Sequence, residues 1–143
     1  MFKILSICFC LFFLLSCNTN TNEANLLSAK ATRVLSGQTI EVMLTETSKI
    51  TKVRITGIDA PDLRQSPWGE TARERLTELV MGVPISIETD NLKSDRFNRI
   101  NAHIWQNNTS IGEQLVKEGY VLANMEYPHS YSKLLIDAQE YAR

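Results

Sequence analysis

Residues 34–62 read VLSGQTIEVMLTETSKITKVRITGIDAPD. Gly37 separates two short apolar runs, and glycine tolerates the positive φ that a tight turn between strands requires. Apolar side chains then alternate with other side chains over residues 39–44 and again over residues 51–56, which is the period of a β-strand. This stretch therefore predicts a β-hairpin followed directly by a third strand.

The hydrophobic period changes in the next segment, over residues 67–81. One face of a helix would here carry the apolar residues Trp68, Ala72, Leu76, Leu79 and Val80. Ser66 is a suitable N-cap, Pro67 suits the first position of a helix, and Gly82 suits its end. We therefore expect a helix from Pro67 to Met81 with Trp68 on its apolar face.

More strands and helices are predicted after this helix. They are strands at residues 83–88 and 100–105, a short helix from Ser110 to Gly119, and a last helix starting near Ser130 or Tyr131. Ser110 and Glu113 form a capping box for the short helix, and Gly119 tolerates the left-handed conformation that ends it. Asn107-Asn108 is a plausible turn after the last strand.

This order of elements is typical of an OB-fold, a mainly β protein with a five-stranded barrel, a helix after strand 3 and C-terminal helices. An α+β sheet packed on helices would produce a similar order, so the elements alone leave both folds open. The length of 143 residues suits one domain. A net charge of -1 argues against a polycation that coats DNA, so any contact with nucleic acid must be local.

The N-terminal segment has the pattern of a secretory signal peptide over residues 1–16. Lys3 is its one charged residue and an apolar run follows, too short for the ~20 residues of a membrane-spanning helix. Leu14-Leu15-Ser16-Cys17 resembles the bacterial lipobox, in which the cysteine is lipidated and becomes the new N-terminus. We expect lipidation at Cys17, a polar tether over residues 17–28 and the folded domain over residues 29–143.

The three cysteines, at positions 8, 10 and 17, all lie in or directly after this leader. The body of the chain therefore contains no cysteine for a disulfide, a zinc-thiolate site or thiol catalysis. The expected location is the cell envelope, where the exported chain is attached to a membrane through the lipid on Cys17.

Three motifs in the body carry a resemblance to a known family. They are Ser36-Gly37-Gln38-Thr39-Ile40, Arg54-Ile55-Thr56-Gly57-Ile58-Asp59-Ala60-Pro61-Asp62 and Asp95-Arg96-Phe97-Asn98-Arg99. Together they resemble the thermonuclease family, the staphylococcal-nuclease-like, calcium-dependent phosphodiesterases. The resemblance runs from about Val34 to Arg143 and includes Gly69-Glu70 and residues 115–120. It implies the same five-stranded OB-fold barrel.

The resemblance also implies catalytic roles for Arg54, Asp62 and Arg99. The two arginines would bind the phosphate, whose charge grows during hydrolysis and which a guanidinium contacts with paired hydrogen bonds. Asp62 would be the general base for the attacking water, although it is one methylene shorter than the family's glutamate. Taken alone, Arg54 would be a solvated strand residue and Asp62 a turn residue, and both interpretations stay open here.

A calcium site is implied at Asp59, Gln38 and the backbone carbonyl of Ala60. Gln38 stands where the family has a second aspartate, so one negative charge is lost from a site whose affinity depends on the number of carboxylates. We therefore expect weak calcium binding or the use of another divalent ion. Asn98 replaces a glycine before Arg99, and asparagine accepts the left-handed conformation of such a turn.

Substrate contacts are expected from Arg96, Phe97 and Tyr127. Arg96 adds a charge to the loop of Arg99, Phe97 offers a ring face to a base, and Tyr127 falls where the family has a tyrosine on the substrate side. Phe97 is as well suited to a core position. His103 is expected on the surface of a strand and His129 in a loop.

The sequence thus predicts an exported, lipid-anchored nuclease that hydrolyses DNA or RNA with the help of a divalent metal, and that acts as a monomer. Gln38 and Asp62 are expected to attenuate its activity. The main alternative is a catalytically weak or inactive OB-fold module that binds nucleic acid or glycan at the envelope. A purely structural lipoprotein is a third possibility, which the combination of Arg54, Asp62 and Arg99 disfavours.

Overall fold

The computed structural model describes residues 25–89 and 91–143. The predicted signal peptide, the lipobox and Cys17 lie outside these residues and stay predictions. Within the part that is described, no helix combines the length and the apolar composition needed to cross a membrane.

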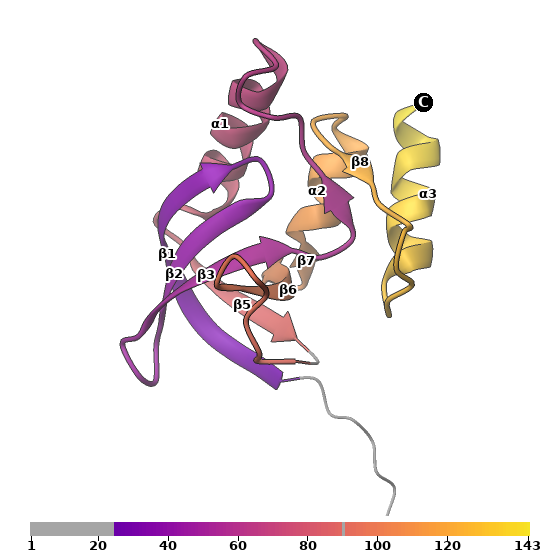
Figure 1. Cartoon of the computed structure of the whole chain (residues 1–143). Helices are drawn as coiled ribbons and strands as arrows, with labels where there is room; N and C mark the ends of the chain where they lie inside the picture. The colour runs from indigo at the N-terminus through magenta and orange to yellow at the C-terminus, as the bar shows by residue number, and fades with distance from the viewer. Residues whose placement is uncertain (1–24, 90) are drawn as a thin grey trace, which may run out of the picture.

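The described residues form a closed barrel of mixed strands (Figure 1). Its strands are β1 (Asn25–Ser36), β2 (Thr39–Leu44), β3 (Ile50–Ile55), β5 (Pro84–Thr89) and β6 (Arg99–Gln106). They are hydrogen-bonded in the order β3-β2-β1-β5-β6, and a parallel pairing of β3 with β6 closes the barrel. The prediction of a five-stranded OB-fold is confirmed, and the alternative of an open α+β sheet is excluded.

The first strand starts earlier than the sequence indicated. Residues 25–28, which were expected in the polar tether, belong to β1 and pair with Thr89 to Ser86 of β5. Leu27 is partly buried and packs against the core. The polar composition of the neighbouring residues hid this strand, because one of its faces lies in solvent and carries few apolar side chains.

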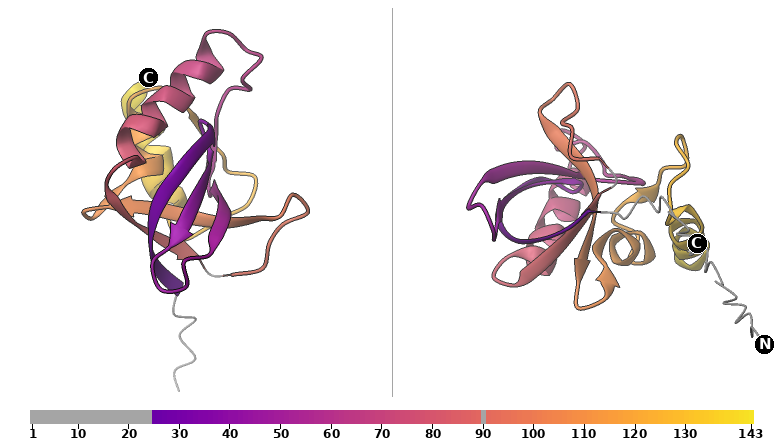
Figure 2. Two further views of the ribbon diagram at one scale, coloured as in Figure 1. Left: turned by 90° about the vertical axis from the view of Figure 1, so that its left-hand side faces the viewer. Right: turned by 90° about the horizontal axis from the view of Figure 1, so that it is seen from below.

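Three helices and two short pairings complete the described part of the chain. The helices are α1 (Trp68–Val80), α2 (Ile111–Lys117) and α3 (Ser132–Ala142). The short strands are β4 (Ile58–Asp59), which pairs with β8 (Leu122–Ala123), and β7 (Thr109–Ser110), which pairs antiparallel with the end of β6. Figure 2 shows α2 between the barrel and α3, so α3 reaches the barrel largely through α2.

The first helix differs from the prediction at its beginning. Its N-cap is Pro67, no side chain caps it, and Ser66 lies before it in a cis peptide bond with Pro67. Ala72, Leu76 and Val80 are buried as expected, but the side chain of Trp68 is 67% exposed. The next residue, Gly69, is the one packed closely against another part of the chain, because a Cβ there would lie 2.1 Å from the carbonyl oxygen of Asp62.

The hairpin turn at Gly37 is present, although the reason for the glycine is different. Gly37 does not adopt a positive φ. A Cβ at this position would lie 2.7 Å from the Cβ of Ala72 and 2.9 Å from the Cβ of Ala60. Glycine is therefore required because α1 and the loop after β4 pack directly on the turn.

Several local predictions are confirmed. The hydroxyl of Ser110 accepts a hydrogen bond from the backbone N–H of Glu113 at 3.2 Å and caps α2, and Gly119 after that helix has a φ of 79°. Asn107 and Asn108 both adopt positive φ values in the turn between β6 and β7. These features depend on neighbouring residues alone, which is why the sequence predicts them.

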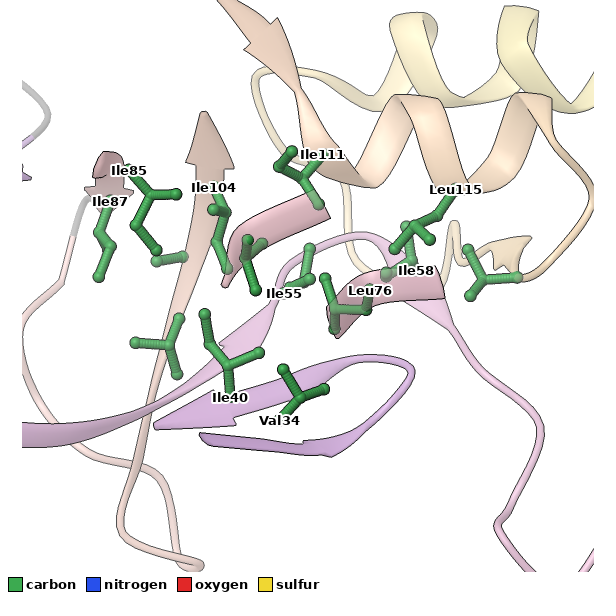
Figure 3. Close-up of a cluster of buried hydrophobic side chains, with 14 of the residues drawn as sticks. Val34, Ile40, Ile55, Ile58, Leu76, Ile85, Ile87, Ile104, Ile111 and Leu115 are labelled. Atoms are coloured by element: carbon green, nitrogen blue, oxygen red, sulfur yellow. The ribbon is translucent and has the colours of Figure 1, made fainter. Parts of the chain in front are cut away.

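The core lies inside the barrel and under α1 and α2 (Figure 3). Its side chains converge from all three sources, as the labelled positions Ile40, Ile104, Leu76 and Leu115 show. Isoleucine and valine predominate on the strands, since branched side chains fill a pleated surface well. This packing holds in place β3, β4 and the start of β6, where the second and third of the motifs described above lie.

Candidate active site

Arg54 is held in place by its own strand and the following turn. Its Nη1 donates to the carbonyl oxygen of Ile55 at 2.9 Å, and its Nη2 donates to the carbonyl oxygen of Ile58 at 3.2 Å and to Oδ1 of Asp59 at 2.8 Å. These bonds need the chain to fold back after β3, which Gly57 permits with a φ of 79°. The guanidinium is therefore fixed relative to the barrel and largely buried.

Arg99 is fixed in a similar way by the loop that precedes β6. Its backbone N–H and its Nε both donate to the carboxylate of Asp95 at 3.0 Å. Burial raises the pKa of Asp95, but hydrogen bonds from Arg99 and from the Phe97 backbone outweigh it and hold that pKa below its ordinary value. Asn98 has a φ of 58°, which confirms the left-handed turn expected there.

The two arginines lie on the same face of the barrel. Arg54 of β3 pairs in parallel with Asn101 of β6, and Arg99 is two residues before Asn101. Side chains two residues apart on a strand point to the same face. The pairing of β3 with β6, which closes the barrel, therefore brings these two arginines to one face although they are far apart in the sequence.

Both arginines line one surface hollow of about 810 Å³, which we call the arginine hollow. Its walls also include Arg96, Phe97, Asn124, Glu126 and Tyr127. The Phe97 ring is 58% exposed and lies 4.7 Å from the Arg96 guanidinium carbon and 5.0 Å from that of Arg99, so it is not a core residue. Tyr127 is 76% exposed. The structure therefore brings together all three residues predicted to contact substrate.

Asp59 lies beside this hollow on β4. Besides the bond from Arg54, its Oδ2 accepts from Nδ2 of Asn124 at 2.6 Å. Asn124 also donates its backbone N–H to the carbonyl oxygen of Gly57 at 2.8 Å. Sequence reasoning missed Asn124, because nothing in the pattern around it indicates that β8 would bring it to Asp59.

The residues predicted to bind calcium fit that ion poorly in their present arrangement. Oε1 of Gln38 accepts the backbone N–H of Ala60 at 2.7 Å, and both carboxylate oxygens of Asp59 accept hydrogen bonds. Among the described residues no three acidic, histidine or cysteine side chains gather as a metal site would need. Calcium takes about six to eight oxygen ligands and its affinity rises with the number of carboxylates. The set offers one carboxylate, already paired with Arg54.

Asp62 is placed differently from the two arginines. Its Oδ1 accepts the backbone N–H of Arg64 at 2.8 Å and Nε of Arg64 at 2.9 Å, and it does not line the arginine hollow. The Arg64 side chain holds the pKa of this carboxyl below its ordinary value. This geometry is the turn chemistry that the sequence left open, and the role of Asp62 as general base stays a prediction.

His129 lies in a loop as the sequence predicts, whereas His103 is half-buried on β6, and the contact between them was not expected. The rings of His103 and His129 lie 4.9 Å apart, and burial together with the neighbouring His129 lowers the pKa of His103 to about 4. Nε2 of His129 would lie 2.3 Å from a Cβ at Gly57. His129 thus packs on the turn between Arg54 and Asp59, a contact that no local sequence signal indicates.

Known proteins are similar in sequence to most of the described part of this chain. A family model described as Staphylococcal nuclease homologue matches residues 52–143. Endonuclease YncB of Bacillus subtilis is 30% identical over 122 residues, which cover 81% of this chain and 56% of that protein. The SPbeta prophage-derived endonuclease YokF of B. subtilis is 32% identical over 111 residues, which cover 73% and 36% respectively.

A more distant relative is the thermonuclease of Staphylococcus intermedius, which is 26% identical over 117 residues, covering 78% of this chain and 68% of that protein. The chain spans about half the length of Endonuclease YncB and about a third of the length of YokF. The stretch that matches the family model contains Arg54, Asp59, Arg99 and Tyr127 and begins after Gln38.

Proposed function

Because the chain belongs to the family of staphylococcal nuclease homologues, we propose that it is an endonuclease that hydrolyses phosphodiester bonds of DNA or RNA at the arginine hollow. The observation that carries the proposal is the pair of fixed guanidinium groups of Arg54 and Arg99 on one face of the barrel. Two such groups suit a phosphate whose negative charge increases in the transition state.

Both arginines retain hydrogen-bonding capacity for a substrate. An arginine side chain carries five N–H donors. Within the described residues, Arg54 makes three side-chain hydrogen bonds, and Arg99 makes one together with an ion-pair contact from its Nη2 to the same Asp95. The remaining donors are held in place before substrate arrives, so little reorganisation is needed when charge develops on the phosphate oxygens. Phe97 and Tyr127 would then offer ring faces to the adjacent bases.

The test of this proposal is a cleavage assay with the body of the chain from residue 17 on single-stranded DNA, first with calcium and then with a chelator. Accumulation of shorter fragments is the expected result. The second candidate, an OB-fold module that binds without cutting, is favoured by the pairing of Asp62 with Arg64 and by the neutral Gln38. Binding without fragments at any calcium concentration would establish that candidate instead.

We further propose that calcium or another divalent ion binds weakly beside Asp59. Replacing Gln38 with Asp should tighten calcium binding roughly tenfold, because a second carboxylate would be added to the oxygens available there. Isothermal titration calorimetry with calcium measures this directly. Gln38→Asn is the matched control, since asparagine has the length of aspartate without its charge, and equal affinity in the two variants would contradict the prediction.

The cellular placement that we propose is attachment to the outer face of an envelope membrane through a lipid on Cys17, with the nuclease domain as a monomer. Replacing Cys17 with Ala should abolish fatty-acid labelling of the protein and release it into the soluble fraction, because the lipobox cysteine is the acceptor of the lipid. Cys10→Ala is the control and should leave labelling intact. Labelling that persists in Cys17→Ala would refute the anchor.

A further inference from the structure

A second hollow adjoins the arginine hollow on the other side of Asp59. We call it the Trp68 groove, and its volume is about 660 Å³. It is lined by Asp59, Ala60, Pro61, Trp68, Tyr120 and Leu122, among others. β8 supplies Leu122, which is paired with Asp59 across the short β4–β8 sheet, and the beginning of α1 supplies Trp68.

The two hollows share a wall. Asp59 lines the groove, while its two hydrogen-bond partners Arg54 and Asn124 line the arginine hollow. A ligand that contacts the guanidinium of Arg54 is therefore directly beside the groove. The groove thus lies next to the site of the proposed reaction, with Asp59 between them.

The groove presents large apolar side chains to solvent. Trp68 is 67% exposed and Leu122 is 66% exposed, although Ala72 and Leu76 of the same helix as Trp68 are fully buried. An exposed apolar surface in a hollow is typical of a binding site. Neither side chain is buried in the core, so both are accessible to a ligand.

The charges around the groove disfavour a phosphate there. None of the described residues that line it is lysine or arginine, and the charged ones are Asp59 and Glu118. Glu118 is paired with Arg75, whose Nε donates to it at 2.7 Å, and this bond holds the pKa of Glu118 below its ordinary value. A phosphate would therefore find no positively charged partner among the described residues that line the groove, whereas an uncharged aromatic ring needs none.

We propose that the Trp68 groove binds an unpaired nucleobase of the same strand whose phosphate is held by Arg54 and Arg99. This inference rests on the proposed function and adds a base-binding subsite to it. The indole of Trp68 offers a flat, rigid surface, and stacking on an aromatic side chain tolerates any base. A base inside a duplex is stacked on its neighbours and cannot enter, so the subsite selects single-stranded nucleic acid.

The experiment measures the affinity of a short single-stranded DNA oligonucleotide and of an abasic oligonucleotide with the same number of phosphates. Trp68→Ala should weaken binding of the first about tenfold and leave binding of the second unchanged, because it removes stacking alone. Trp68→Phe should keep most of the affinity and also checks that the fold survives. Tyr141→Ala is the control, since Tyr141 is 78% exposed on α3 and lines neither hollow.

Failure of this inference is distinguishable from failure of the proposed function. If the protein cleaves DNA and Trp68→Ala binds both oligonucleotides as the parent does, the subsite is refuted and the nuclease stands. An equal loss with both oligonucleotides would also refute it, since a base-specific contact cannot act on an abasic strand. If the parent neither binds nor cleaves either oligonucleotide, the proposed function and the subsite both fail.

Discussion

Arg99→Ala should lower the rate of phosphodiester cleavage by about two to three orders of magnitude, the usual effect of removing one fixed donor from a charged transition state. The loop should persist without this side chain, because the Asp95 carboxylate also accepts backbone N–H groups from Phe97 and from residue 99 itself. A steady-state assay on single-stranded DNA measures the loss. Arg99→Lys should recover little, since lysine keeps the charge but not the planar fork.

The control for this experiment is Arg33→Ala. Arg33 lies on β1, is paired with Glu41 and does not line either hollow. Its removal changes the net charge as much as removal of Arg99 but leaves the arginine hollow intact. Cleavage by Arg99→Ala at the rate of the Arg33 variant would contradict a role for Arg99 in binding the reacting phosphate.

Gly57→Ala should lower the free energy of unfolding by about 3 kcal/mol, because two penalties add at this position. Its φ of 79° is unfavourable for any residue with a Cβ. The new methyl group would also lie 2.3 Å from Nε2 of His129 and 2.6 Å from Cδ1 of Leu135. Urea denaturation followed by circular dichroism measures the change.

Gly82 separates these two penalties. It has a φ of 77°, but a Cβ there would meet no atom within 4 Å. Gly82→Ala should therefore cost only about 1 kcal/mol, the backbone contribution alone. If the two variants lose equal stability, His129 does not pack on the turn between Arg54 and Asp59 as tightly as the structure indicates.

Much of the fold was predictable because its signals are local. Alternation over residues 39–44 and 51–56 depends on which face of a strand is buried, and the cap at Ser110 depends on residues within one turn. The prediction was wrong at Trp68 and at residues 25–28. Hydrophobicity alone placed Trp68 on the core face, whereas it is the first residue of α1 and lies largely in solvent.

The candidate site was predictable only in part. The resemblance to thermonucleases identified Arg54, Arg99, Phe97 and Tyr127, which the structure brings to one hollow. It also predicted that Asp62 would join them, but Asp62 binds Arg64 in its own turn. The side-chain partners of Asp62 are chosen by loop geometry, which neither spacing nor residue type specifies.

The sequence by itself determined the strands β2, β3, β5 and β6, the capped start of α2 and the residue types at the site, because periodicity and capping are properties of residues close together in the chain. Only the tertiary structure decided which distant residues meet. The parallel pairing of β3 with β6 placed Arg54 beside Arg99, and the β4–β8 pairing brought Asn124 to Asp59 and Leu122 to the groove of Trp68. The first contact arises from closing the barrel and the others from the separate β4–β8 sheet, and in both cases packing and backbone hydrogen bonding select segments that are far apart in the sequence.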